Sequence, residues 1–339
     1  MFDIMNKKNL LFFLLIFSLI PFLFGETRGY ISFEYIKGQA QADVPHGSFQ
    51  NAQAGLFFSG AVMAKVFYVS EIRFIEENQF ELNQALISYQ PSTSFNLKLG
   101  LYLVPFGKYN LSSRPHQTML VNDPLNVEYM FPSRWRDIGI LFEGRTRSFF
   151  YSAYLGNGLS ESENLSGGQQ YRDNNVDKGK GGRVGIALNQ WSEIAYSYFN
   201  GKYDEDNSRD LVLHGVDLVW SAEGFQILSE YSKAYLDNPE GLEPGEAEGY
   251  FVQLSFNMGA IRPVVSYQKI KYEDRFHGPG FLSSDTPGTG ILEEKSRWAL
   301  GLVWSVSQNF FLKFEYDFNR EEDLELKDDS FSLQAALSF

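Results

Sequence analysis

The chain contains no cysteine, and only four of its 339 residues are histidine. Without cysteine it has no disulfides, no thiolate nucleophile and no cysteine-ligated metal. Positive charge is also in short supply, because 29 Lys and Arg stand against 42 Asp and Glu, which gives a net charge of -13. Nucleic-acid binding depends on a basic surface that neutralises phosphates, so we expect no nucleic-acid partner.

The few histidines do not form a catalytic or metal-binding pattern. His46, His116 and His277 lie in predicted loops, and His214 stands in "VLHGVDL" with no nucleophile two residues away. Neither a Gly-x-Ser-x-Gly motif nor a pair of metal ligands is present. The acidic stretch "DEDNSRD" at 204–210 lacks the Gly and Glu of an EF-hand calcium loop. We therefore predict that the chain is not an enzyme and has no cofactor and no metal site.

Only one long apolar run is present, over residues 10–24. Two lysines precede it and Gly25 follows it, which is the layout of a secretory signal peptide. A membrane anchor is the alternative, but the run is shorter than the roughly 20 residues that a spanning helix needs, and Pro21 interrupts it. We predict that residues 1–25 are a signal peptide and that residues 26–339 form one mature domain.

What the chain has in quantity is aromatic residues, at 16%, and segments that alternate between apolar and polar side chains. In "FFLKFEYDFN", Leu312 and Phe314 share one face, while Lys313 and Glu315 share the other. This period of two is typical of a strand between two different environments. Sixteen such strands are predicted, near 29–38, 51–60, 63–75, 80–90, 94–104, 135–144, 147–156, 181–189, 191–200, 210–220, 223–235, 247–257, 260–271, 295–305, 308–319 and 329–339.

The gaps between these segments alternate in length. Tight turns such as "AV", "PST" and "RT" alternate with longer polar loops, and the gap at 76–79 is the exception. Short turns at one end and long loops at the other indicate an up-and-down transmembrane β-barrel of an outer membrane. A soluble sandwich or propeller also alternates, but the chain shows neither a linker nor a blade-length repeat.

The chain ends on Phe339, the last apolar residue of an alternating strand. A barrel in lipid must close, because unpaired backbone groups find no water there. We therefore expect the last strand to pair with the first. A terminal Phe in this setting resembles the assembly signal that the barrel assembly machinery reads in bacterial outer-membrane proteins.

Strand parity predicts which charged side chains face the lumen. They are Arg73, Lys98, Arg183, Arg262, Arg297 and Lys313, with Glu71, Asp137, Glu143, Asp217, Glu230, Glu315 and Asp317. About sixteen strands leave an aqueous channel. Rings of one charge sign set ion preference in such channels, and here neither sign prevails.

The longest loop, over 105–134, is unusually apolar, so we expect it to fold inward and narrow the channel. Its candidate constriction residues are Lys108, Arg114, His116, Asp123 and Glu128, followed at its end by Arg134, Arg136 and Asp137.

"NLKLGLYLVPFGKYN" at 96–110 and "RWRDIGILFEG" at 134–144 resemble the phosphate-selective porin O and P family. The resemblance implies a sixteen-stranded, trimeric porin whose third loop forms the constriction. Phosphate selection in that family uses a ladder of basic residues. This loop carries only Lys108 and Arg114, which Asp123 and Glu128 offset.

These observations lead to a functional hypothesis. We predict a porin of the bacterial outer membrane through which small hydrophilic solutes or ions diffuse. An anion- or phosphate-selective channel is the alternative, and a non-conducting surface anchor or adhesin is a second one. The expected partners are outer-membrane lipid and lipopolysaccharide, the barrel assembly machinery, small solutes, and copies of the same chain in a homotrimer.

Overall fold

The computed structural model describes residues 25–76, 79–162, 165–238, 244–272, 294–322 and 326–339. Apart from Gly25, the predicted signal peptide lies outside these ranges, so the cleavage of the signal peptide stays a prediction. His277 also lies outside them. Among the described residues, no helix has the length and apolar character needed to cross a membrane.

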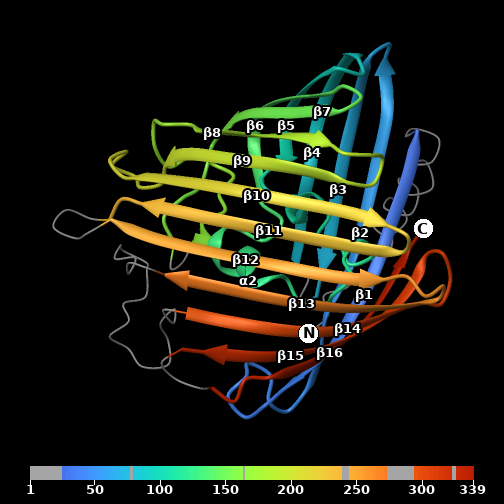
Figure 1. Cartoon of the computed structure of the whole chain (residues 1–339). Helices are drawn as coiled ribbons and strands as arrows, with labels where there is room; N and C mark the ends of the chain where they lie inside the picture. The colour runs from blue at the N-terminus through green and yellow to red at the C-terminus, as the bar shows by residue number, and fades with distance from the viewer. Residues whose placement is uncertain (1–24, 77–78, 163–164, 239–243, 273–293, 323–325) are drawn as a thin grey trace, which may run out of the picture.

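Sixteen strands close into one antiparallel barrel (Figure 1). Each strand pairs with the next along the chain, and β16 pairs with β1, which confirms the predicted fold class. The strands are β1 (Glu26–Gly38), β2 (Ser48–Met63), β3 (Val66–Ile75), β4 (Gln79–Ser92), β5 (Phe95–Leu103), β6 (Arg136–Arg145), β7 (Phe149–Gly156), β8 (Gly179–Ala187), β9 (Glu193–Lys202), β10 (Asp210–Ala222), β11 (Phe225–Leu236), β12 (Gly245–Phe256), β13 (Ile261–Tyr272), β14 (Glu294–Ser305), β15 (Phe310–Glu321) and β16 (Ser330–Ser338).

The terminal residue is part of the barrel wall. Gly29 N–H donates to Phe339 O at 2.8 Å, and Phe339 N–H donates to Gly29 O at 2.9 Å. A Cβ at residue 29 would stand 2.4 Å from the Phe339 ring, so glycine leaves room for that ring. The expected closure of the last strand on the first is confirmed. The role of Phe339 as an assembly signal stays a prediction.

Turns and loops alternate around the barrel as expected, but some tight turns are shifted. The turn between β10 and β11 lies at residues 223–224 instead of 221–222. The sequence placed the turn between the second and third strands at Ala61 and Val62. The structure instead extends β2 through a bulge to Met63 and turns at residues 64–65. Lys65 adopts a left-handed conformation there, with φ at 67°. A two-residue hairpin turn needs such positive φ values, and the apolar pattern alone does not locate them.

The two faces of the wall differ as the alternation predicts. On β14, Trp298 and Leu300 point outward and are 52% and 49% exposed, whereas Arg297 and Ala299 point inward and are buried. Large apolar side chains cover the outer surface of the other strands too. An apolar surface of this extent needs lipid around it.

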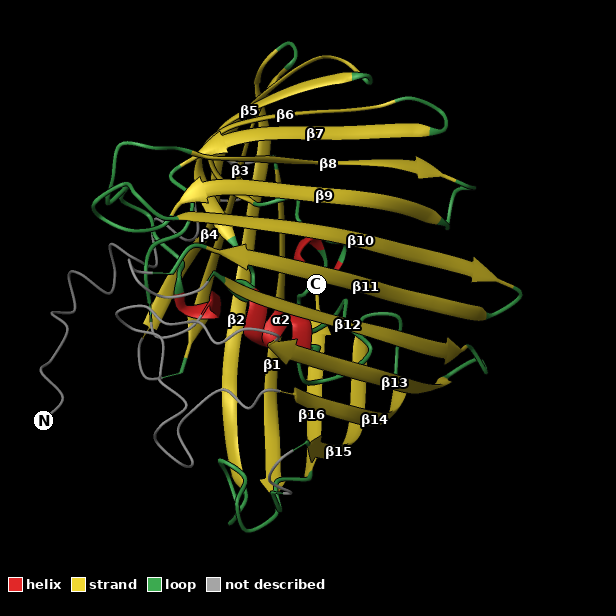
Figure 2. Ribbon diagram, turned by 60° about the vertical axis from the view of Figure 1, so that its left-hand side comes forward, coloured by secondary structure: helices red, strands yellow, loops and turns green. Residues whose placement is uncertain are grey.

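The interior is occupied by residues 104–135, named here the lumen loop. It contains the 3-10 turn η1 (Tyr109–Leu111) and the helix α2 (Leu125–Met130), which lies inside the barrel in both views (Figure 1, Figure 2). The loop's apolar side chains form a buried cluster with the inner wall. Trp135 meets the Phe199 ring of β9 edge-on at 4.9 Å between centroids. The expectation that the loop folds inward is confirmed.

Candidate functional site: the lumen loop

The "PFG" turn directs the lumen loop from the end of β5 into the barrel. Gly107 has a φ of 67°, and a Cβ there would lie 2.5 Å from the Glu230 carboxylate. The backbone N–H of Gly107 donates to Ser197 Oγ at 3.1 Å, and that of Tyr109 donates to Glu230 Oε1. A side chain at position 107 would block this approach, so glycine is required.

Asn110 ties the two ends of the loop together. Its Nδ2 donates to Val104 O at 2.8 Å and to Trp135 O at 3.0 Å. Its Oδ1 accepts the Trp135 N–H at 2.7 Å. This role of Asn110 could not be predicted, because a single asparagine in a loop carries no signal of it.

Lys108 and Arg114 of the loop are paired with wall carboxylates. Lys108 Nζ lies 2.8 Å from Glu193 Oε1 on β9. Arg114 binds Glu71 on β3 with two parallel hydrogen bonds, from Nε at 3.0 Å and from Nη2 at 2.7 Å. A bidentate pair of this kind fixes orientation as well as charge. Strand parity also identifies Glu193 as lumen-facing, because Ser197 and Phe199 of the same strand are buried inside.

The middle of the loop is attached to the opposite wall. The backbone N–H groups of Val121 and Asn122 both donate to Glu315 Oε2, the second at 3.0 Å. Lys313 Nζ donates to Thr118 Oγ1 at 2.8 Å. Since the loop also reaches β3 and β9, it crosses the lumen instead of lining one side.

Helix α2 has its own attachments. Leu125 N–H donates to Gln268 Oε1 at 3.1 Å, and Glu128 pairs with Arg297 at 3.2 Å. Asp123, just before the helix, accepts hydrogen bonds from Tyr109 Oη at 2.9 Å and from a serine hydroxyl within the loop. Two of the expected constriction carboxylates are therefore used to hold the loop in shape.

His116 lies against Tyr30 of β1, with 5.2 Å between ring centroids. Burial lowers the pKa of His116 to about 4, and the positive charges of Arg114 and Lys313 add to this effect. The imidazole is therefore neutral at ordinary pH and contributes no charge to the constriction.

The structure buries two residues that the sequence placed at the pore surface. Arg136 is 6% exposed and donates to Asn83 Oδ1 at 2.7 Å, and Asp137 is fully buried. Asp137 accepts the backbone N–H groups of Asn157 and Gly158 and so holds the β7–β8 loop. Arg134, in a left-handed conformation, reaches the backbone of the lumen loop. These three residues anchor loop ends.

Wall cations are also paired. Arg183 lies 2.5 Å from Asp217 and 3.0 Å from Glu193. The other ion pairs at lumen-facing positions are Arg73 with Glu81, Lys98 with Glu143 at 2.6 Å, and Arg297 with Asp317 at 3.8 Å. Arg262 faces inward and has no ion pair among the described residues. A ladder of free cations is therefore missing from the described part of the wall.

A cavity of about 350 Å³ lies between the start of the lumen loop and the short-turn end of the wall. We name it the chamber. Its basic residues are Lys108, Arg145 and Arg183, and its acidic ones are Glu143 and Glu193. Arg145 and Arg183 both stand over the ring of Phe150, at 5.5 Å and 4.8 Å. Neutral polar lining comes from Gln90, Thr93, Asn96, Tyr151 and Ser152.

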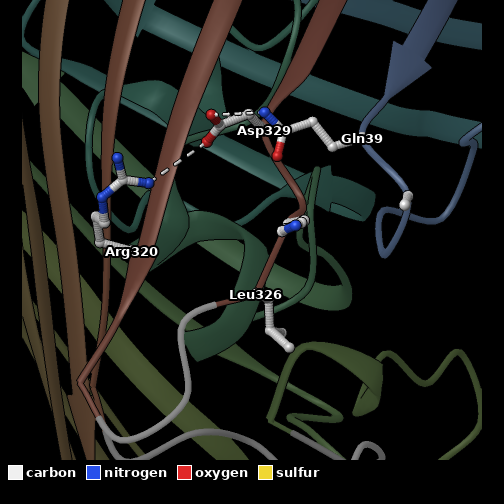
Figure 3. A pocket seen from close by; sticks show the side chains of 6 residues that line it. Gln39, Arg320, Leu326 and Asp329 are labelled. Atoms are coloured by element: carbon white, nitrogen blue, oxygen red, sulfur yellow. Dashed lines mark hydrogen bonds and ion pairs between the residues drawn. The ribbon is translucent and has the colours of Figure 1, made fainter.

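A second cavity, of about 710 Å³, lies where the loop ends of β1, β15 and β16 meet (Figure 3). Asp329 accepts a hydrogen bond from Gln39 at 3.1 Å and lies 3.8 Å from Arg320. This cavity shares no lining residue with the chamber. Across the described residues, no group of three or more His, Asp and Glu side chains is arranged to hold a metal.

The fold is shared with solved outer-membrane proteins. The anion-selective porin of Comamonas acidovorans superposes with a TM-score of 0.67 at 10% identity, over 93% of this chain and 99% of that porin. OmpF of Salmonella typhi, in complex with daunomycin, gives 0.67 at 12% identity, over 93% and 97%. A loop L8 deletion mutant of OmpT, an outer membrane protein of Vibrio cholerae, gives 0.65 at 11%, over 93% and 98%.

Sequence comparison is less informative. The chain matches no family model. An uncharacterized protein of Aquifex aeolicus is 24% identical in an alignment of length 214, and the match covers 54% of this chain and 48% of that protein. The match therefore spans about half the length of that relative. The chain has the barrel fold of bacterial outer-membrane proteins, porins among them.

Proposed function

We propose that the protein is a porin of the outer membrane through which small hydrophilic solutes diffuse. The observation that carries this proposal is a sixteen-stranded barrel whose lumen is crossed by a loop fixed to its wall by polar contacts. A barrel that only had to be plugged could be filled by apolar side chains alone. It would not need the wall carboxylates and amides that bind this loop. A lumen lined by paired charges favours water and polar solutes over any single ion type.

An anion- or phosphate-selective channel is the second candidate. Lys108, Arg145 and Arg183 in the chamber favour it, as does the resemblance of residues 96–110 and 134–144 to the phosphate-selective porins. Against it, Lys108 and Arg183 each lie within 3.0 Å of Glu193. Carboxylates that occupy these cations compete with an incoming anion, so we rank this function below general diffusion.

Catalysis has little support in the lumen. Of the histidines that the structure describes, His214 is the one in a strand. It points outward, and its Nδ1 lies 2.6 Å from the Tyr196 hydroxyl. His116 lies beside Tyr30, with no serine or threonine hydroxyl bonded to it in the described structure. We therefore propose that the protein is not an enzyme.

A homotrimer is part of the proposal. One structural neighbour, OmpT of Vibrio cholerae, is described in a trimer form. On this chain, the outward residues near the loop ends of β3, β4, β6 and β7 are apolar and exposed: Phe74, Phe80, Leu82, Ile138 and Leu155. Copies of the chain packed against this arc would cover these residues.

Swelling of liposomes that contain the mature protein tests the diffusion proposal. Neutral sugars of increasing size should enter at rates that fall smoothly with size, and phosphate should have no advantage over chloride. A preference for phosphate over chloride of tenfold or more would support the second candidate instead. Liposomes that do not swell would contradict both channel functions and favour a non-conducting surface anchor or adhesin.

A further inference from the structure

Six charged side chains point outward near the loop ends of β11–β14, on the surface opposite the lumen. We name them the rim patch: Lys233, Glu246, Glu248, Lys269, Lys271 and Glu294. Their inward neighbours, among them Ala234, Ala247 and Ile270, are buried. The porin mechanism does not use the rim patch, because none of its residues faces the channel.

The depth of the rim patch follows from the aromatic residues beside it. On each of the four strands, the next outward aromatic residue toward the middle of the strand is Tyr231, Tyr250, Tyr267 or Trp298. Tyr267 contacts Trp298 at 4.8 Å and Tyr250 at 6.1 Å between ring centroids, which forms a continuous belt. Aromatic girdles mark the edge of the hydrocarbon layer. The rim patch therefore lies at headgroup level on the long-loop side.

The strands bring the two charge signs together in alternation. Lys233 pairs in register with Glu248, Glu248 with Lys271, and Lys271 with Glu294. Lys233 Nζ also lies 2.9 Å from Glu246, and Lys269 is bonded to Glu294. Lys271 lies outward beside Glu248 and Glu294 in the strand register.

The loop ends of β3 and β4 differ from this arc. At the corresponding loop ends of β3 and β4, the outward residues Phe74 and Phe80 are 44% and 72% exposed and contact each other. Charges facing hydrocarbon cost roughly 2–4 kcal/mol at the midplane and little at the interface. Single outward charges or pairs also stand at other loop ends, such as Lys37 on β1, Lys180 on β8 and the Lys202–Asp210 pair of β9 and β10. On β11–β14, six outward charges stand together on adjacent strands, so this arc places the largest group of them at the level of the headgroups.

We propose that the rim patch binds a phosphorylated lipid headgroup together with its divalent counter-ions, as in lipopolysaccharide. Lysines bind phosphate as point charges, and carboxylates are ligands for Mg²⁺ and Ca²⁺. A leaflet of phosphates bridged by divalent cations presents both signs, and an alternating patch complements both. The inference rests on the outer-membrane location in the proposed function, but not on conductance.

The test uses the purified mature protein in detergent and measures its affinity for diphosphoryl lipid A in Mg²⁺ by native mass spectrometry. A variant with Lys269→Gln and Lys271→Gln should bind about thirty-fold more weakly, because each surface lysine contributes about fivefold. The matched control carries Lys37→Gln and Lys180→Gln, which remove two outward lysines from β1 and β8. That control should stay within about twofold of wild type.

Two further measurements identify the chemistry. Glu248→Gln should weaken binding in Mg²⁺ and have no effect in EDTA. A phosphate-free glycolipid should bind wild type and variants alike. The proposal is overturned if the control loses as much affinity as the rim-patch variant, if the phosphate-free lipid binds as tightly as lipid A, or if the rim-patch variant changes oligomeric state, which would assign the surface to a second copy. Conductance of the variants, measured in parallel, tests the porin function separately.

Discussion

At the scale of single residues, the lumen loop is held by pairs of opposite charge. Arg114 is the clearest case, because its guanidinium binds Glu71 with two hydrogen bonds and stands 4.8 Å over the Phe57 ring. Glu71 is only 1% exposed. The charge of a buried carboxylate is stable only beside its partner. A substitution of Arg114 on the loop therefore also affects Glu71 on the wall.

Arg114→Ala should therefore have two effects. It leaves the Glu71 charge unmatched, which should shift the reversal potential toward cations and lower the free energy of unfolding by about 3–5 kcal/mol. Bilayer recordings in a salt gradient and urea unfolding of the refolded protein measure the two effects. The double change Arg114→Ala with Glu71→Ala is the control, and it should return the reversal potential toward that of wild type. An unchanged reversal potential in Arg114→Ala would remove this residue from the constriction.

His116 gives the lumen loop a dependence on acid. The unfolded chain takes up a proton at this side chain below about pH 6.5, whereas the folded protein does so only near pH 4. The unfolded state binds more protons between these values, so the free energy of unfolding should fall as the pH falls through this window. His116→Asn should flatten that slope, as measured by urea midpoints from pH 7 to pH 4. His46→Asn, in the β1–β2 loop, is the control; an equal flattening there would contradict the assignment.

At the scale of elements, the lumen loop crosses the barrel interior and is attached to the wall at several strands. Its start is held by β9 and β11, its middle by β15, and helix α2 by β13 and β14. The loop contributes apolar side chains to a cluster that fills one side of the lumen. In the proposed porin, the path for solutes therefore lies between the loop and the remaining wall.

Glu315→Gln tests the attachment at β15. The two backbone N–H groups of the loop would lose the carboxyl group that accepts both of them, and a hydrogen bond is worth about 0.5–1.5 kcal/mol. The loosened loop should give noisier and larger single-channel steps. Glu294→Gln removes an outward carboxylate from β14 and should leave the steps as in wild type. Steps that are equal in the two variants would show that this contact does not position the loop.

Sequence alone predicts most of the elements and little of the contacts. Alternation reveals a strand because the wall separates two environments, and parity therefore places Arg183, Arg297 and Lys313 inside. The apolar composition of 105–134 predicts that this loop folds inward. Neither signal indicates how deep in the membrane a residue lies or where it stands around the barrel axis. The pairing of Arg114 with Glu71, 43 residues away, follows from the path of the loop and is visible only in three dimensions.

Burial of the loop ends was also hidden from the sequence. Arg136 and Asp137 stand at the start of β6, where a charged residue reads as pore lining. The structure instead surrounds them with Asn83 and the backbone of the β7–β8 loop. That loop is distant in sequence, and its fold over β6 depends on turn geometry that alternation does not encode.

At the scale of the whole molecule, the barrel has different outer arcs and a balanced interior. The largest group of adjacent outward charges lies on β11–β14, whereas apolar residues extend to the loop ends of β3, β4, β6 and β7. This division suits a barrel that meets lipid headgroups on one side and copies of itself on the other. Inside, carboxylates accompany nearly every described wall cation, so the field has no dominant positive sign.

The reversal potential of the purified protein in a planar bilayer, under a salt gradient, tests the central claim most directly. A water-filled lumen with paired charges predicts stepwise conductance without a strong anion preference. A strong anion preference would contradict the balanced interior and favour the phosphate-type channel. A bilayer with protein inserted but no conductance steps would contradict the porin function itself and show that the lumen loop closes the barrel.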